Sequence, residues 1–320
     1  MSPVNDSCLR VAMWSGPRNI STAMMRSFEN RSDCEVVDEP FYAAYLVKTG
    51  LEHPGSHEIV ASQPTTWQAV ADRLITEHPA PVYFQKHMTQ HLLPGMDLSF
   101  TKQLSNCFLI RDPARIILSY ARVRPTFSLE ELGIPQQVAL FDAECERLGE
   151  PPPVLDAALT LANPECVLRK LCWKLGIHFE ERMLRWPAGP RDSDGVWSPY
   201  WYSRVLKSTG FEATLSSSSD YAGDETASRK LAQREVRSSD YGTPSDKALD
   251  QQPGYQSDNQ SDNQFTNASG KEPARASQNE KPSTPSKPVK ELDGEQLEMC
   301  ALAERSYERL RRFAIDGGSV

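Results

Sequence analysis

The chain has 320 residues, of which 24% are charged and 39% are hydrophobic, and its formal net charge is −8. This acidic balance argues against a general nucleic-acid binder, because neutralising phosphates needs a basic surface. No stretch approaches the ~20 apolar residues of a membrane span. The seven cysteines show neither a CxxC pair nor metal-ligand spacing, and no signal-peptide pattern accompanies them. We therefore expect a protein of the reducing cytoplasm that contacts neither nucleic acid nor membrane and holds no metal.

Short apolar runs alternate with helical patterns through the first half of the chain. Strands are predicted at residues 9–14, 34–37, 82–84, 106–110 and 153–156. Helices are predicted at residues 20–30, 66–78, 113–122, 136–148 and 164–175. Uniformly apolar strands that alternate with helices indicate a parallel sheet covered on both faces. The predicted fold class is therefore α/β, a three-layer sandwich with a central parallel sheet.

The composition changes after Glu212. Residues 213–290 hold only six large aliphatic or Phe side chains among 78 residues. Such a segment cannot bury enough apolar surface to offset its ordering entropy, which predicts a disordered low-complexity insertion. Helical spacing returns beyond it, at Met299, Ala303, Tyr307, Leu310 and Phe313. We therefore expect one domain over residues 1–212, the disordered insertion over 213–290, and a last helix within 291–320 that packs on the domain.

The loop after the first predicted strand has the composition of an anion-binding site. It reads Ser15, Gly16, Pro17, Arg18, Asn19, Ile20, Ser21 and Thr22. A small-residue loop before a helix lets backbone N–H groups and the helix dipole meet at one point, where Arg18 adds a forked cation. A phosphate or phosphosulfate suits this site; the alternative is a capping turn in which Ser21 and Thr22 stabilise the helix start. The loop lacks the Lys and the second Gly of the ATPase pattern GxxxxGK[ST].

A second candidate binding segment follows the fourth predicted strand. Arg111 comes directly after that strand, and Pro113 begins the next helix. This order places Arg111 at the carboxyl edge of the sheet, where open α/β sheets bind their ligands. Ser119, two helical turns further along, is positioned to share a ligand with Arg111.

Together the two segments resemble the sulfotransferase superfamily. The loop from Ser15 to Thr22 is similar to the one that binds the 5′-phosphosulfate of the donor 3′-phosphoadenosine 5′-phosphosulfate (PAPS). Arg111 and Ser119 match the family pattern R-D-P-x(5)-S, whose Arg and Ser bind the donor's 3′-phosphate. The similarity is greatest to soluble sulfotransferase-like proteins with a Gly-Pro-Arg phosphate loop, some of them labelled aminotransferase-like. It implies a P-loop-type fold and PAPS as co-substrate. Two departures stand out: Arg18 replaces the family's usual loop Lys, and the C-terminal Arg-Lys-Gly motif has no convincing copy.

The resemblance also suggests two candidates for the catalytic base. Lys86 and His87 follow the third predicted strand, where cytosolic sulfotransferases carry a Lys and a catalytic His. In that interpretation His87 takes the proton, since the pKa of histidine lies near neutrality, and Lys86 neutralises the bridging oxygen. Glu39 is the second candidate, because carbohydrate-type sulfotransferases use a Glu in this region, and its neighbours Phe41 and Tyr42 would wall an acceptor pocket. The alternatives are a structural polar group for His87 and a solvated loop acid for Glu39.

The stretch from Trp186 onward is rich in aromatic residues, which are most often core. Through the resemblance, Trp201, Tyr202 and Phe211 are candidates for holding the adenine, and Arg191 for a donor phosphate. The predicted function is transfer of a sulfuryl group from PAPS to a hydroxyl or amine of a small molecule or carbohydrate. One alternative is a P-loop kinase or nucleotide hydrolase. The other is a non-catalytic nucleotide-binding scaffold whose insertion recruits partners.

Overall fold

Five parallel strands form the centre of the molecule. The computed structural model describes residues 8–76, 78–211 and 292–318. The sheet order is β2-β3-β1-β4-β5. The strands are β1 (Leu9–Ser15), β2 (Cys34–Asp38), β3 (Val82–Met88), β4 (Ser105–Ile110) and β5 (Val154–Asp156). Because every pair is parallel, all five carboxyl ends lie along one edge. The predicted α/β class with a central parallel sheet is confirmed.

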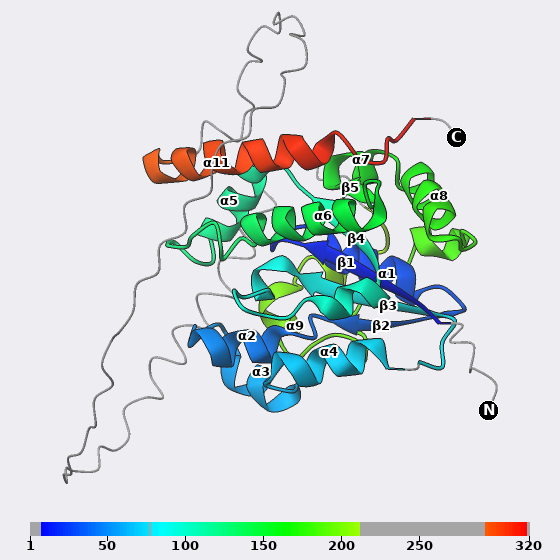
Figure 1. The fold of residues 1–320 in the computed structure, drawn as a ribbon, viewed down its shortest axis with the longest axis horizontal. Coiled ribbons are helices and arrows are strands. Elements are labelled where there is room, and N and C mark those ends of the chain that lie inside the picture. The colour runs from blue at the N-terminus through cyan, green and yellow to red at the C-terminus, as the bar shows by residue number, and fades with distance from the viewer. Residues whose placement is uncertain (1–7, 77, 212–291, 319–320) are drawn as a thin grey trace, which may run out of the picture.

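Helices connect the strands and cover both faces of the sheet (Figure 1). The longer ones are α1 (Ser21–Glu29), α2 (Tyr42–Thr49), α4 (Trp67–Ile75), α5 (Pro113–Ala121), α6 (Ile134–Leu148), α8 (Pro164–Leu175) and α11 (Gly294–Arg311). Shorter ones are α3 (Ser56–Ser62), α7 (Ala157–Ala162) and α9 (Ser198–Trp201). Short 3₁₀ turns are η1 (Thr89–His91), η2 (Ser99–Gln103), η3 (Glu181–Leu184) and η4 (Val205–Lys207).

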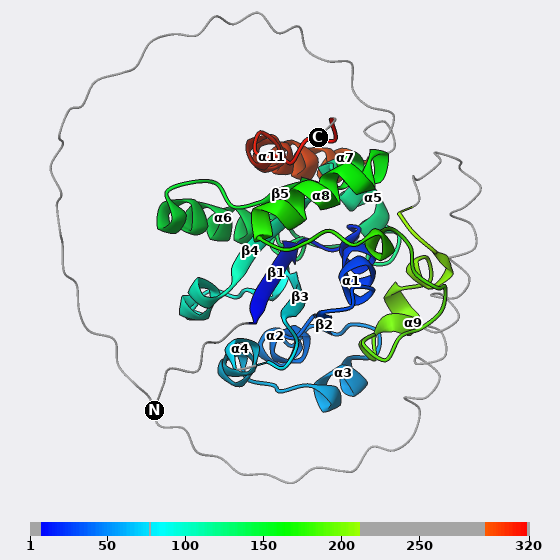
Figure 2. The same cartoon turned by 90° about the vertical axis from the view of Figure 1, so that its right-hand side faces the viewer.

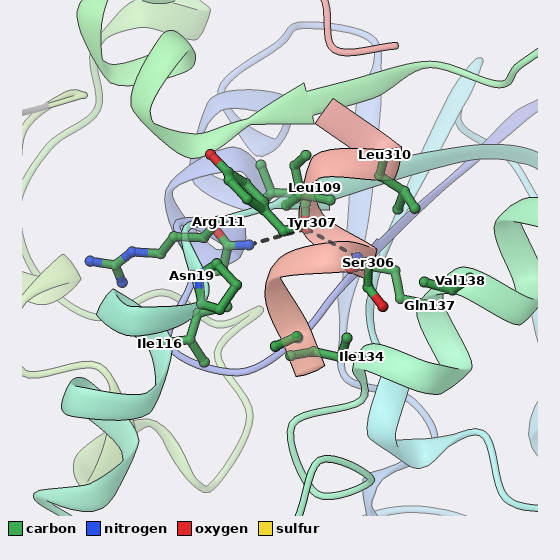
Figure 3. A pocket seen from close by; sticks show the side chains of 14 residues that line it. Asn19, Leu109, Arg111, Ile116, Ile134, Gln137, Val138, Ser306, Tyr307 and Leu310 are labelled. Carbon is green, nitrogen blue, oxygen red and sulfur yellow. Dashed lines mark hydrogen bonds between the residues drawn. The ribbon is translucent and has the colours of Figure 1, made fainter. Parts of the chain in front are cut away.

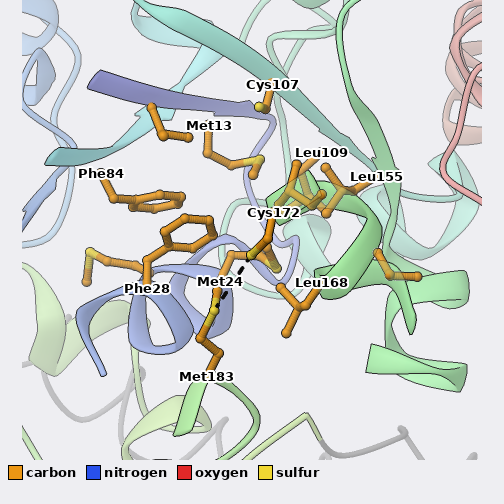
Figure 4. Packing of buried hydrophobic residues seen from close by; sticks show 14 of the residues in the cluster. Met13, Met24, Phe28, Phe84, Cys107, Leu109, Leu155, Leu168, Cys172 and Met183 are labelled. Carbon is orange, nitrogen blue, oxygen red and sulfur yellow. Dashed lines mark hydrogen bonds between the residues drawn. The ribbon is translucent and has the colours of Figure 1, made fainter. Parts of the chain in front are cut away.

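Two apolar layers flank the sheet, one on each face. On the first, Met13 and Phe84 pack against α1, where the rings of Phe28 and Phe84 stack at 4.3 Å (Figure 4). On the second, Trp14 and Phe108 pack beneath α4 and α6. Figure 2 shows α1 on one side of the sheet and α6 on the other. Successive residues of a strand point to opposite faces, so the double burial explains why β1 is apolar without interruption.

The last helix packs across the β5 end of the sheet. The hydroxyl of Tyr307 donates a hydrogen bond to Asp156 Oδ2 at 2.7 Å, and the other oxygen of Asp156 caps α7. Leu310 is buried in the layer beneath α6, and a capping box of Asp293 and Gln296 begins α11. The predicted insertion at 213–290 lies outside the described residues. None of the helices described is long and apolar enough to cross a membrane.

Candidate functional site

The loop between β1 and α1 is shaped for a close approach to a ligand. Arg18 has a φ of 57°, in the left-handed region that non-glycine residues rarely adopt. A Cβ on Gly16 would lie 2.6 Å from the Leu132 carbonyl oxygen, so only glycine fits there. Ile20 is the N-cap residue of α1 and supplies no capping side chain. The first N–H groups of α1 are therefore not capped by that residue, which is the arrangement that anion-binding helix starts use.

The structure brings Arg18, Arg111 and Ser119 together at this loop. The Arg18 Nε atom donates to Ser119 Oγ at 2.9 Å, and the Arg111 guanidinium donates to the Arg18 carbonyl oxygen. Asn19 fastens the loop to β4 through its amide, which donates to the Leu109 carbonyl at 3.1 Å. Figure 3 shows Asn19 and Arg111 at a pocket that α11 also lines. Residues about a hundred positions apart thus form one cationic cluster at the carboxyl ends of β1 and β4.

A buried ion cluster lies at the carboxyl ends of β2 and β3. The Lys86 Nζ atom is 2.7 Å from Asp38 Oδ1, 2.6 Å from Glu39 Oε1 and 2.7 Å from the Tyr202 hydroxyl. Lys86 is only 1% exposed and pairs in register with Asp38. Glu39 has a φ of 39°, and in the described part of the chain Arg18 is the one other non-glycine residue with a positive φ. Both strained positions follow a strand directly, as expected of functional backbone.

The charges of this cluster set its proton affinity. Burial opposes charge on Lys86, but the Asp38 and Glu39 carboxylates outweigh it and raise the pKa of Lys86 well above its ordinary value. Burial raises the pKa of Glu39; Lys86 opposes that rise and Asp38 adds to it. One ammonium faces two carboxylates, so one negative charge remains uncompensated. Glu39 is therefore the group of this cluster suited to accept a proton.

The prediction that the third strand ends at Phe84 is wrong, because β3 continues through Lys86 and His87 to Met88. Adjacent strand residues face opposite ways, so Lys86 shares the α1 face while His87 lies on the other. There the His87 ring stacks on Trp14 at 4.1 Å, and its Nε2 atom lies 3.1 Å from Gln85 Oε1. Burial lowers the pKa of His87 to about 3. The geometry separates Lys86 from His87 and favours Glu39 as the base.

The remaining predicted residues lie apart from the loop. Arg191 Nη1 is 3.7 Å from Glu29 Oε2, at the opposite end of α1, and a helix of this length spans ~13 Å. Phe211 packs edge-on against Trp186, with the two ring centroids 5.1 Å apart. Tyr202 contacts Lys86 instead of the donor loop. The structure therefore brings none of these three to the cationic cluster.

An aromatic wall adjoins Glu39 along the chain. Tyr42 stacks on His91 at 4.9 Å, and its hydroxyl lies 2.7 Å from His53 Nδ1. Trp197 meets the Tyr42 ring edge-on at 5.2 Å. Two buried nitrogen atoms of this wall, His53 Nε2 and His91 Nδ1, have no hydrogen-bond partner among the described residues. Phe41, in contrast, lies near His87 on the other face.

Sequence reasoning missed Asp38 and Tyr202, which complete the ion cluster. Asp38 ends a buried strand directly before Glu39, and that position was a usable signal. Tyr202 had no such signal, because it stands 116 residues from Lys86 in a stretch where many aromatic residues are core.

Comparison with known proteins places this chain among described families. Residues 9–231 match a family model described as the sulfotransferase domain. The branched-chain-amino-acid aminotransferase-like proteins 2 and 1 of Arabidopsis thaliana are 38% and 39% identical over 201 residues, covering 62% of this chain. The chain spans 36% of the length of each relative.

Solved structures with a similar arrangement are more distant in sequence. The sulfotransferase domain of the Synechococcus PCC 7002 olefin synthase is 15% identical, with a TM-score of 0.43 over 76% of this chain and 99% of that one. A sulfotransferase from Alicyclobacillus acidocaldarius is 12% identical, with a TM-score of 0.41 over 54% of this chain and 87% of that one.

Proposed function

The chain belongs to the sulfotransferase domain family, and from this membership we propose that it moves a sulfuryl group from PAPS to a hydroxyl or amine of a small molecule or carbohydrate. One observation carries the proposal. The cationic cluster of Arg18, Arg111 and Ser119 and the ion cluster of Lys86 and Glu39 lie at the same edge of one sheet. An anion site beside a proton acceptor is what sulfuryl transfer requires.

The residues of the loop fit a donor that carries phosphate and sulfate. In this proposal the start of α1 and Arg18 hold the phosphosulfate, while Arg111 and Ser119 hold the 3′-phosphate. Gly16 permits the close approach of backbone N–H groups. When bound, PAPS supplies the activated sulfuryl group and leaves as 3′-phosphoadenosine 5′-phosphate (PAP). The forked guanidinium groups and the helix dipole stabilise the negative charge that develops.

Glu39 performs the proton step in this proposal. Its pKa is raised by burial, which brings the carboxylate closer to the proton affinity of a useful base. Lys86 keeps its positive charge and opposes the charge of the departing oxygen. The wall of Tyr42, His53 and His91 follows Glu39 and provides flat apolar surface with unpartnered nitrogen atoms. We therefore propose that the acceptor binds against this wall.

A cytoplasmic location is part of the proposal. All seven cysteines are free thiols, which suits a reducing compartment. The proposed recruitment of partners through the insertion concerns residues outside the described ranges.

Binding of PAP tests the proposal directly. We expect PAP to bind the full chain in calorimetry. Ser119→Ala and Arg18→Ala should weaken the affinity by roughly 10- to 100-fold, the loss expected for a charge-assisted contact. Arg309→Ala is the matched control, since Arg309 is half-exposed and pairs with Asp142 on the surface. Labelled PAPS screened against phenols, sugars and amines then identifies the acceptor.

Each alternative function predicts a different result. Binding of ATP with magnesium but not PAP would contradict the proposal in favour of a kinase or hydrolase. Binding of PAP without turnover of any acceptor or of water would favour the non-catalytic scaffold.

A further inference from the structure

The Lys86 ammonium uses all of its hydrogen-bonding capacity in the ion cluster. Its three N–H groups meet three oxygen atoms, from Asp38, Glu39 and Tyr202, at 2.6–2.7 Å. An ammonium has three donors and no acceptor, so Lys86 turns an N–H toward any new partner only by giving up one of these three contacts.

The three contacts differ in how firmly their oxygen atoms are held. The Tyr202 hydroxyl donates to Asp38 Oδ2 at 2.6 Å and accepts a bond from Trp197 Nε1 at 3.2 Å. The backbone N–H of Gly195 also donates to Asp38 Oδ2, at 3.2 Å. Asp38 and Tyr202 thus hold each other as well as Lys86. Glu39 is the more accessible partner, because 11% of its side chain is exposed against 2% for Asp38.

We propose that Tyr202 and Asp38 are positioning residues, which fix the Lys86 ammonium on two of its N–H groups so that the third, now on Glu39, is the one that reacts. The inference rests on the function proposed above. When Lys86 turns that third N–H toward a leaving oxygen, the Glu39 carboxylate loses its ion pair and becomes a stronger acceptor for a proton. Asp38 and Tyr202 thereby link the two roles of the cluster.

A phenol is suited to this position because its oxygen serves as donor and acceptor together. Tyr202 donates one bond to Asp38 and accepts bonds from Lys86 and Trp197. Replacement by Phe leaves Lys86 with an unpaired N–H and Asp38 with an unpaired oxygen in a buried place. Phe is close to Tyr in size, so the loss falls on the hydrogen bonds.

The chain contains a matched control for this substitution. Tyr307 donates to Asp156 Oδ2 at 2.7 Å at the end of β5, as Tyr202 donates to Asp38 at the end of β2. Tyr202→Phe and Tyr307→Phe therefore remove the same kind of bond from two ends of one sheet. Only the first removes a partner of Lys86.

The first measurement needs no donor. In the full chain labelled with ¹⁵N-lysine, the Lys86 ammonium, assigned with Lys86→Arg, should exchange its protons with water slowly. We expect Tyr202→Phe to speed this exchange at least about tenfold, the effect of losing one bond to a charged group, and Tyr307→Phe to leave it unchanged. Trp197→Phe, which removes only the N–H donated to Tyr202, should give a smaller increase and serves if Tyr202→Phe does not fold.

The second measurement separates binding from turnover. Tyr202→Phe should lower kcat for PAPS turnover roughly 10- to 100-fold and change the Kd of PAP by less than about threefold. Unchanged proton exchange in Tyr202→Phe and Trp197→Phe, or no slowly exchanging Lys86 signal in the wild type, overturns the inference. A wild type that binds no PAP overturns the proposed function instead, and the exchange rates still decide the role of Tyr202.

Discussion

Glu39 and His87 compete for the role of base, and single substitutions separate them. Glu39 is paired with Lys86, whereas His87 stacks on Trp14 on the other face of the sheet. We expect Glu39→Gln to lower PAPS turnover by ~10²–10⁴-fold, the usual contribution of a general base, with little change in PAP affinity. His87→Phe keeps the stack on Trp14 and should retain turnover. An inactive His87→Phe beside a normal Glu39→Gln would return the base role to His87.

The buried histidines make stability depend on pH. Burial lowers the pKa of His53 to about 4 and that of His87 to about 3, while both titrate near 6.5 when unfolded. Above ~6.5 both states hold these rings neutral, and stability is complete. As the pH falls below ~6.5 the unfolded chain binds the protons first, so stability declines down to the folded pKa values.

The expected loss is measurable by urea unfolding between about pH 7 and pH 4.5. His87 contributes roughly 3–5 kcal/mol over its full window, because each pKa unit corresponds to ~1.4 kcal/mol. His87→Phe should remove its share of the slope without changing the rest. A wild-type stability that stays flat from pH 7 to pH 5 would show that these rings are accessible to protons in the folded state.

Helix α1 is held to the segment that leads toward Tyr202 by a buried ion pair. Arg26 is 1% exposed and donates to both oxygens of Asp194 at 2.5 and 2.7 Å. Removing either partner leaves an uncompensated buried charge, so Arg26→Met or Asp194→Asn should cost ~3–5 kcal/mol in urea unfolding. Arg169→Met, which breaks an exposed pair with Glu165, should cost under ~1 kcal/mol. Equal losses for the buried and exposed pairs would contradict this interpretation.

The five strands were predictable because each is a short apolar run between helical patterns. The extent of β3 was not. Gln85, Lys86 and His87 read as the polar end of a strand, yet all three are buried within it. Each is satisfied by a distant partner: Gln85 donates to the Leu74 carbonyl, and Lys86 binds Asp38. Polarity signals a strand end only where no such partner waits.

The site divides in the same way between local and distant signals. The loop at Arg18 and the pair of Arg111 and Ser119 were predictable from motifs that a few neighbouring residues complete. The bond between Arg18 and Ser119 follows once both motifs lie at one sheet edge. The role of Tyr202 depends on a contact across the whole domain, and its own neighbours in sequence carry no trace of it. Helices α2 and α3 were missed because they are only 8 and 7 residues long.

For the whole molecule, the strand order explains where the site lies. β1 stands between β3 and β4, so the chain leaves β1 toward one half of the sheet and returns to build the other. At such a reversal the loops diverge and leave a crevice at the carboxyl ends. The loop at Arg18 leaves β1 there, with Lys86 on β3 on one side and Arg111 after β4 on the other. The topology therefore brings the anion site and the ion cluster together.

The last segment completes the molecule by closing the β5 end of the sheet. Beyond α11, the N–H of Ile315 donates to the Val154 carbonyl at 2.8 Å, and Ala314 forms a parallel bridge with Val154. An edge strand left open this way invites pairing with other chains. A chain that ends at residue 211 should therefore aggregate or melt at a lower temperature than the full chain.

These contacts do not require the residues between the domain and the last helix, because they are side-chain and backbone bonds that a separate piece can make. We expect co-expression of residues 1–211 with residues 292–320 to restore solubility and PAP binding. Leu310→Ala in the smaller piece should weaken the association by ~2–5 kcal/mol, the cost of a buried cavity, and Leu302→Ala, at an exposed position, should not. Failure of the two pieces to associate would mean that residues 212–291 contribute to the folded domain, contrary to the prediction from their composition.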